Sequence, residues 1–263
     1  MIDTGMGKSR AVFRFYEELN DFLPPCLRKR PFDVVFEGRP SVKDVIEARG
    51  IPHAEVDLIL INGRSVDFGH PLNDGDRVSV YPVYESLDIS PVIRLRPEPL
   101  REPKFILDVH LGKLARLLRL AGLDAAYRND YQNKEIVETA RREHRCILTR
   151  DRHLLKRKTV TRGVWIRSSD PRMQLKETIR RFDLTGRIDP FSRCLKCNVE
   201  LEPVDKEHIR DRLPPRTKRY YRSFKECPQC GRIYWKGSHY RHMKKCLNAW
   251  TAEISGPADS DRG

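Results

Sequence analysis

Two Cys-x-x-Cys pairs stand near the end of the sequence, Cys194 with Cys197 and Cys227 with Cys230. The short spacing lets backbone amides turn back toward thiolate sulfurs. Two such pairs supply four thiolates, which fill a tetrahedral site and leave no position for water. The spacing therefore predicts a structural zinc site, carried by a zinc ribbon over residues 190–247.

A second ligand set shares one of these pairs. Cys227, Cys230, His242 and Cys246 follow a Cys-x₂-Cys-x₁₁-His-x₃-Cys spacing, which is also typical of zinc sites. This set leaves the first cysteine pair without a metal, so we favour the four-cysteine site.

Three aspartates follow predicted strands in the middle of the sequence: Asp108, Asp130 and Asp151. Because ligands of an open parallel sheet lie beyond the carboxyl ends of its strands, we expect these side chains to gather at one edge. Clustered carboxylates repel one another unless divalent cations neutralise them, and Mg²⁺ or Mn²⁺ prefers oxygen ligands. Two such ions activate a water and stabilise the leaving oxygen in phosphodiester cleavage.

The same aspartates also have a purely structural interpretation. An aspartate after a strand often caps the next helix, as Asp151 would before Arg152. Asp170 is either a further acid of the site or the cap of a helix that begins at Pro171. The sequence alone leaves both interpretations open.

Basic and polar side chains lie close to these aspartates. Three cations recur every three residues in the helix predicted after Asp108, and we expect them to share one face. Three more side chains flank Asp151. We expect all six to hold RNA phosphates, with a solvated basic surface as the alternative. They are Lys113, Arg116, Arg119, Thr149, Arg150 and Arg152.

The elements that must position these residues fall into separate regions. Residues 11–88 contain strand-like runs, a helix that Ser41 would cap, and turns at Asn62-Gly63 and Asp74-Gly75-Asp76, which together predict a β-grasp domain. Residues 89–103 are rich in proline and predict a linker. Residues 104–185 alternate between strand and helix patterns, which indicates an α/β domain with a mostly parallel sheet. Residues 251–263 are polar and predict a disordered tail.

Composition limits the function classes. The 263 residues carry a formal net charge of +14, which favours nucleic acid as a partner, or an anionic surface. No run of about 18 apolar residues is present, so no membrane span is predicted. The first ten residues lack an apolar signal core, so we expect a cytoplasmic protein in which Cys-x-x-Cys pairs bind metal.

The strings "FILDVHLGKLARLLRLAGLDA" and "CILTRDRHLL" resemble the Mut-seven C-terminal RNase family, a branch of the PIN-like nucleases. The zinc-ribbon region and a ubiquitin-like domain in front also fit that family. The resemblance implies a PIN-like three-layer domain between a β-grasp domain and a zinc ribbon, with metal-dependent ribonuclease activity. Asp108 and Asp151 match the first and third acidic positions of the family.

One departure from the family pattern bears on activity. The position where relatives usually have an aspartate, at the start of the second helix, is Asn133 here. Asp130 or Glu135 would have to replace that acid, and Asp130 is preferred because Glu135 would point elsewhere on a regular helix. The alternative is a non-catalytic RNA-binding adaptor. A third hypothesis is a scaffold that binds a protein partner through the β-grasp domain.

Overall fold

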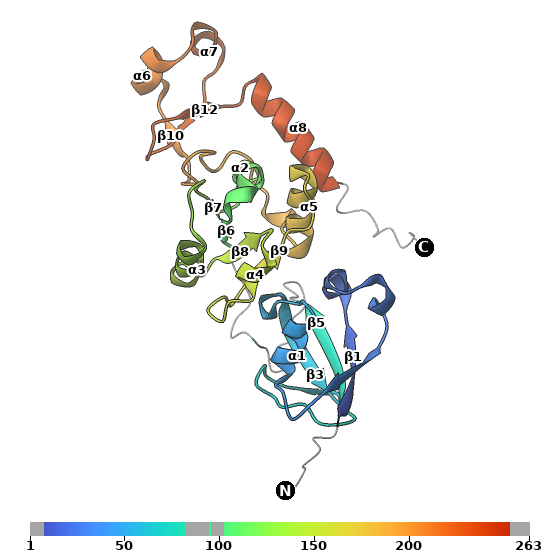
Figure 1. Ribbon diagram of the computed structural model, residues 1–263. Coiled ribbons are helices and arrows are strands. Elements are labelled where there is room, and N and C mark those ends of the chain that lie inside the picture. The colour runs from blue at the N-terminus through green and yellow to red at the C-terminus, as the bar shows by residue number, and fades with distance from the viewer. Residues whose placement is uncertain (1–7, 83–94, 96–102, 253–263) are drawn as a thin grey trace, which may run out of the picture. The chain divides into compact units, whose positions relative to one another are not determined.

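The computed structural model of the chain describes residues 8–82, 95 and 103–252, and it divides the chain into two compact units (Figure 1). The first unit comprises residues 1–102 and 137–165, and the second comprises residues 103–136 and 166–263. The predicted linker and tail lie almost wholly outside the described residues. None of the described helices is both long and apolar enough to cross a bilayer.

The N-terminal part of the first unit is a five-stranded sheet with one helix against it, and the predicted β-grasp fold is confirmed. In the sheet β1 pairs in parallel with β5 and antiparallel with β2, and the strand order is β2-β1-β5-β3-β4. Its elements are β1 (Ser9–Phe15), β2 (Phe32–Phe36), α1 (Val42–Ala48), β3 (Val56–Ile61), β4 (Arg64–Ser65) and β5 (Arg77–Pro82), with 3-10 turns η1 (Glu17–Phe22), η2 (Pro25–Leu27) and η3 (His53–Glu55).

Alternation and turn chemistry explain this fold. Along β1, Ala11, Phe13 and Phe15 are buried on one face, as the two-residue period of a strand requires. Ser41 accepts a hydrogen bond from the Asp44 amide and caps α1 as predicted.

The two predicted turns are joined by one buried carboxylate. Asn62 and Gly63 both have positive φ, of 51° and 80°, which a two-residue hairpin turn between β3 and β4 requires. Asp76 is 6% exposed and accepts from the Asn62 side chain and from the Asn73 amide, each at 2.8 Å. The turns therefore hold each other in place at one end of the sheet.

The remaining part of the first unit carries the strand before Asp151. It contains most of α3 (Asn133–Arg142), then β8 (Cys146–Thr149), α4 (Arg152–Leu155) and β9 (Gly163–Trp165). Strands β8 and β9 pair in parallel. Strand β8 ends shortly before Asp151, as the sequence predicts.

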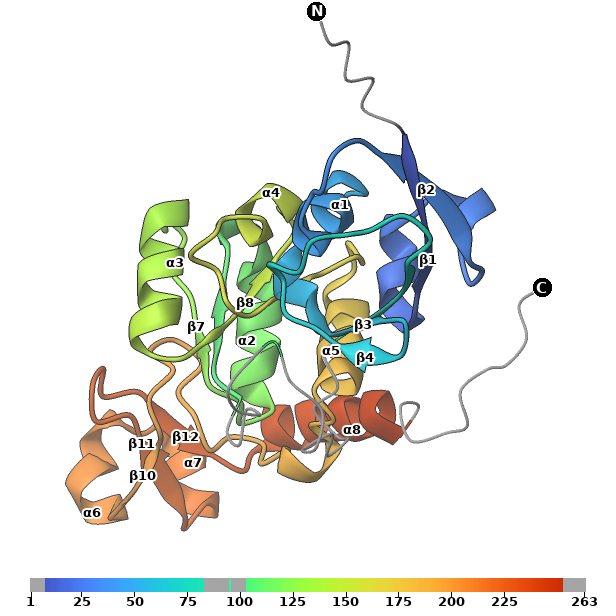
Figure 2. The same ribbon diagram turned by 90° about the horizontal axis from the view of Figure 1, so that it is seen from below.

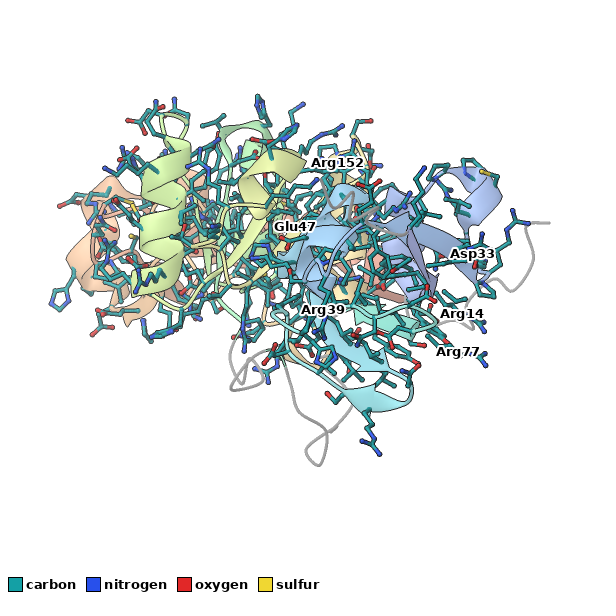
Figure 3. The ribbon with its side chains drawn as sticks, turned by 60° about the horizontal axis from the view of Figure 1, so that its bottom comes forward. Arg14, Asp33, Arg39, Glu47, Arg77 and Arg152 are labelled. Carbon is teal, nitrogen blue, oxygen red and sulfur yellow. The ribbon has the colours of Figure 1, made fainter. Side chains whose placement is uncertain are left out.

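This segment packs on the β-grasp domain through buried polar contacts. His53 is 6% exposed, and its ring bridges the Val160 carbonyl, at 2.9 Å, and a carboxylate oxygen of Glu47, at 2.6 Å. Glu47 is labelled in Figure 3. Glu55 is fully buried and accepts from the Trp165 amide at 2.5 Å. The Trp165 ring lies 5.0 Å from that of Phe22. The β-grasp domain and residues 137–165 therefore pack together as one unit.

The second unit begins with the strand before Asp108. Its elements before the cysteines are β6 (Phe105–Leu107), η4 (Val109–Leu111), α2 (Gly112–Leu120), β7 (Ala125–Ala126), α5 (Pro171–Arg181) and η5 (Thr185–Arg187). Strands β6 and β7 pair in parallel, and α2 packs against α5. Together with the parallel pair β8–β9, these elements confirm the predicted α/β class for the central region.

The C-terminal part of the second unit is a zinc-ribbon fold followed by a long helix. A three-stranded antiparallel sheet, in the order β10-β11-β12, carries it, and the last helix contacts α5 (Figure 2). The elements are β10 (Glu202–Val204), α6 (Lys206–Ile209), η6 (Arg210–Arg212), α7 (Pro215–Tyr220), β11 (Phe224–Glu226), β12 (Ile233–Trp235) and α8 (Ser238–Ala252). The short helices α6 and α7 were not predicted from the sequence.

Replacing the buried Glu55 by alanine should destabilise the first unit by about 1–3 kcal/mol, because the part-buried Trp165 amide loses its acceptor. Urea unfolding followed by tryptophan fluorescence measures the change. Glu37→Ala is the matched control, since Glu37 is exposed just after β2. Equal midpoints for the two variants would show that the Glu55 contact contributes nothing.

Candidate metal centre and candidate nuclease residues

The four cysteines of the two Cys-x-x-Cys pairs converge on one point. Their sulfur atoms all lie within 4.8 Å of one another, and the Cys194 and Cys230 sulfurs are 3.7 Å apart. A tetrahedral Zn²⁺ with Zn–S bonds near 2.3 Å requires sulfurs about 3.8 Å apart, so the spacing fits a bound ion. Within the described part of the chain, this is the one group of three or more potential ligands placed to hold a metal.

The two cysteine pairs form matching turns. The Cys197 amide points at the Cys194 sulfur and the Cys230 amide at the Cys227 sulfur, each at 3.4 Å. The next residues, Asn198 and Gly231, have φ of 70° and 66°, and each donates its amide to the carbonyl of the first cysteine of its pair at 2.9 Å. The left-handed conformation suits glycine and asparagine, which explains the residue after each pair.

Amide and hydroxyl donors prepare Cys194 to ionise. Burial opposes the thiolate, but hydrogen bonds from the Tyr234 hydroxyl and from backbone amides outweigh it and lower the pKa of Cys194 to about 6. The Tyr234 oxygen lies 3.2 Å from the Cys194 sulfur. Burial, hydrogen bonding with Cys230 and the Cys194 charge raise the pKa of Cys197 to about 12. Four thiolates can therefore coexist here only around a cation.

The rival ligand set is not brought together. Cys246 lies 3.7 Å from His242 on α8, but neither belongs to the four-residue cluster. Cys227 and Cys230 are instead partnered with the first cysteine pair, as the four-cysteine prediction required.

The first cysteine turn is fastened to α2 and β7. Arg119 is 6% exposed and its guanidinium donates to the carbonyls of Ala125, Leu195 and Lys196 at 2.8–3.2 Å. Asn198 accepts from the Ala125 amide at 2.9 Å. Arg119 was expected among the phosphate ligands, but its buried donors point at backbone oxygens, so we assign it a structural role.

The other predicted substrate-binding side chains differ in exposure. Lys113 and Arg116 are exposed on α2, whereas Thr149 is fully buried and its hydroxyl accepts from the Asp151 amide. Arg150 and Arg152 are exposed, and the Arg152 guanidinium lies 4.9 Å from the centre of the Trp165 ring. The role of these side chains in binding phosphates stays a prediction.

Asp108 and Asp151 occupy equivalent local positions in their units. Asp108 comes directly after strand β6, and Asp151 comes shortly after strand β8. Each accepts a hydrogen bond through Oδ1 from the amide two residues on, His110 at 2.9 Å and His153 at 2.8 Å. Asp108 is only 4% exposed. Both aspartates therefore cap the turn or helix that follows them. One capping bond leaves each carboxylate able to accept further bonds.

The acids considered as replacements at the second position are engaged in surface contacts. Asp130 is exposed and forms a two-bond pair with Arg128, which holds the pKa of Asp130 below its usual value. Glu135 accepts from the Gln132 amide at 2.8 Å and so helps to cap α3, which begins at Asn133. Asp170 caps α5 through the amides of Arg172 and Met173.

Comparison with known protein families decides the identity. Residues 103–247 match the model of the Mut7-C RNAse domain, which is more than half of the chain, and residues 8–88 match that of the Mut7-C ubiquitin domain. The chain belongs to the Mut7-C RNAse domain family. The matched range of the Mut7-C RNAse domain runs from before β6 into α8, so the ribbon is part of this domain. No curated protein and no solved structure matches the chain.

Substituting serine for Cys227 should remove the bound metal from the Mut7-C domain, because three thiolates no longer close a tetrahedral site. Metal content of the purified protein, measured by mass spectrometry, should fall from one equivalent to nearly none. Cys246→Ser should keep one equivalent. Cys227 belongs to both candidate ligand sets, so Cys194→Ser separates them: retention of metal in Cys194→Ser with loss from Cys246→Ser would reverse our ligand assignment.

Arg119→Ala should lower the free energy of unfolding by at least about 2 kcal/mol, since each lost charge-assisted bond contributes about 1.5–3 kcal/mol and the carbonyls are left without their donor. Lys113→Ala, on the exposed surface of the same helix, should change it by less than about 0.5 kcal/mol. Chemical denaturation of both variants checks this. A stable Arg119→Ala protein would mean that the guanidinium does not hold the ribbon on α2.

Proposed function

We propose that this protein is a metal-dependent ribonuclease that hydrolyses RNA phosphodiester bonds. The observation that carries the proposal is the match of residues 103–247 to the Mut7-C RNAse domain. The net charge of +14 supports a polyanionic substrate. We further propose that the protein acts in the cytoplasm, where free thiols of the Cys-x-x-Cys type persist.

Asp108 and Asp151 are the proposed catalytic carboxylates. Each stands at the end of a strand, with its Oδ1 fixed by a local amide, so its position follows from the backbone and not from a mobile side chain. Carboxylate oxygens are the hard donors that Mg²⁺ and Mn²⁺ prefer. When bound, such an ion lowers the pKa of a water and balances charge on the phosphate.

The second acidic position decides how active the proposed site is. Asp130 has to leave its pair with Arg128 to serve there, and Glu135 has to give up its bond to the Gln132 amide. Asn133 itself offers a neutral amide oxygen, which is a weaker ligand than a carboxylate. The pairing of Asp130 favours the alternative of a non-catalytic RNA-binding adaptor, and activity measurements distinguish the two.

The proposed zinc ion has a different role. Four sulfur ligands fill its coordination sphere, so it would hold the ribbon together and take no part in hydrolysis. The three hydrogen bonds that Arg119 donates would connect the metal-bound ribbon to α2, the helix that follows Asp108.

Asp108→Asn and Asp151→Asn should each reduce Mn²⁺-dependent cleavage of a labelled single-stranded RNA by more than about 100-fold, since loss of a metal ligand exceeds the 10–100-fold cost of losing an outer partner. Denaturing gels with Mn²⁺, Mg²⁺ or Ca²⁺ measure cleavage. Asp205→Asn is the matched control, because Asp205 also stands at the start of a helix, α6 of the ribbon, and is not among the candidate acids.

Asn133→Asp completes the test. Increased cleavage by this variant would support the argument that the missing acid at position 133 limits activity. If the wild-type protein cleaves RNA and the Asp108 and Asp151 variants cleave it equally well, the proposed ligands are refuted. RNA binding without any cleavage by the wild-type protein would favour the adaptor.

A further inference from the structure

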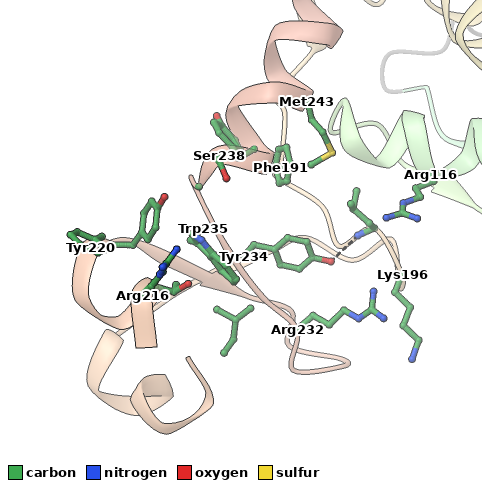
Figure 4. A pocket seen from close by; sticks show the side chains of 16 residues that line it. Arg116, Phe191, Lys196, Arg216, Tyr220, Arg232, Tyr234, Trp235, Ser238 and Met243 are labelled. Atoms are coloured by element: carbon green, nitrogen blue, oxygen red, sulfur yellow. Dashed lines mark hydrogen bonds between the residues drawn. The ribbon is translucent and has the colours of Figure 1, made fainter. Parts of the chain in front are cut away.

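A basic, aromatic pocket lies in the second unit beside the cysteine turns (Figure 4). We call it the ribbon pocket; its volume is about 840 Å³, within the range of about 300–1,000 Å³ typical of ligand sites. Its walls come from the first cysteine turn, from α7, from β12 with the start of α8, and from α2. None of the proposed catalytic carboxylates lines it.

The charge of the ribbon pocket has one sign. Four cations line it, and none of its lining residues is acidic; the four are Arg116, Lys196, Arg216 and Arg232. All four are exposed, and across the described residues none of them forms an ion pair. Other arginines of the ribbon are neutralised, as Arg212 is by Glu226 and Arg210 by Glu207. The pocket therefore has a net positive potential that suits phosphates.

Aromatic rings make up much of the remaining wall. Tyr220 is 67% exposed, although its ring is one of the largest apolar groups of the ribbon. Trp235 and Tyr221 turn one side toward the small core around Phe224, and Tyr234 is held against the Cys194 sulfur. The rings of Trp235, Tyr221 and Tyr234 are held by these contacts before any ligand arrives, so stacking on them orders few side chains.

The arrangement of these groups matches the two parts of a nucleotide. In Figure 4, Tyr220, Trp235 and Arg216 lie at one end of the pocket, and Arg116 and Lys196 lie at the other, with Tyr234 between them. Bases stack on aromatic faces and phosphates bind cations. Bases inside a duplex are stacked on each other and cannot reach such faces, so the geometry selects single strands.

We propose that the ribbon pocket binds a single-stranded segment of RNA, with a base stacked on Tyr220 and the neighbouring phosphates held by the four cations. RNA, as opposed to DNA, rests on the proposed ribonuclease function. The pocket would then anchor substrate for the domain's reaction, because Arg116 projects into it from α2, the helix that begins just after Asp108 and η4.

The proposal ties binding to the metal centre. Leu195 and Lys196 lie between the cysteines of the first pair, and Arg232 to Trp235 follow the second pair. Loss of the metal should therefore disorder two walls of the pocket together.

Fluorescence anisotropy with labelled U₁₂ RNA and dT₁₂ DNA tests the proposal on the full chain carrying Asp108→Asn, without added Mg²⁺ or Mn²⁺. Tyr220→Ala should weaken RNA binding about 5- to 150-fold with an unchanged salt dependence, since it removes stacking alone. Tyr220→Phe keeps the ring and should restore most of the affinity.

The cations give a separate readout. Arg216→Ala with Arg232→Ala should lower the slope of log K against log salt by about 1.4, since each phosphate contact contributes about 0.7 for a single strand. Arg210→Ala is the matched control, because Arg210 is an exposed arginine of the ribbon outside the pocket. All variants should keep one equivalent of metal and the wild-type circular dichroism spectrum.

Several outcomes would overturn the proposal: equal affinities for Tyr220→Ala and Arg210→Ala, equal competition by a duplex of the same length, or no oligonucleotide binding at all. Equal binding of dT₁₂ and U₁₂ would refute its choice of RNA. The ribonuclease proposal is tested separately, by cleavage. RNA binding that depends on the pocket, without cleavage, refutes the ribonuclease proposal alone. Cleavage that depends on Asp108 and is unaffected by the pocket variants refutes the pocket proposal alone.

Discussion

The second unit depends on four sulfur atoms held closer together than their charges allow. Sulfurs within 4.8 Å of one another cannot all be thiolates without a cation, and as thiols they contribute little to a fold of this size. The amide of each second cysteine already points at the sulfur of the first, so the backbone is arranged for the charged, metal-bound form. A metal here completes an arrangement that the local turns begin.

That arrangement extends beyond the ribbon through ordinary hydrogen bonds. The carbonyls of Leu195 and Lys196, inside the first cysteine turn, accept from Arg119, whose helix α2 packs on α5. Burial lowers the pKa of Arg119, while nearby Cys194, Cys197 and Asp124 oppose that shift. The guanidinium thus links the four-cysteine cluster to α2, the helix that follows Asp108 and η4.

Features predicted from the sequence were those fixed by neighbours in the chain. The turn at Asn62-Gly63, the cap at Ser41 and the convergence of the four cysteines each depend on a few adjacent residues, and each is confirmed. By contrast, α6 and α7 bury one side chain each, Ile209 and Thr217, so no apolar period marks them.

The placement of Arg119 shows a limit of periodicity arguments. Steps of three residues in a helix of 3.6 residues per turn drift by about 60° each, so two steps from Lys113 rotate Arg119 by about 120°. Lys113 and Arg116 stay exposed, and Arg119 turns inward. The contacts that receive it, at residues 195 and 196, are about 76 positions away in the chain and leave no local signal.

Asp108 and Asp130 are held in position in different ways. Asp108 is 4% exposed in a chain of net charge +14, and its carboxylate is fixed by a backbone amide. Exposed Asp130, by contrast, is already paired with Arg128. The two aspartates therefore differ in what they offer a divalent ion: Asp108 has its position set by the backbone, and Asp130 must first exchange one cation for another. In the nuclease site that we propose, the strand-end acids are therefore the metal ligands whose positions are set in advance.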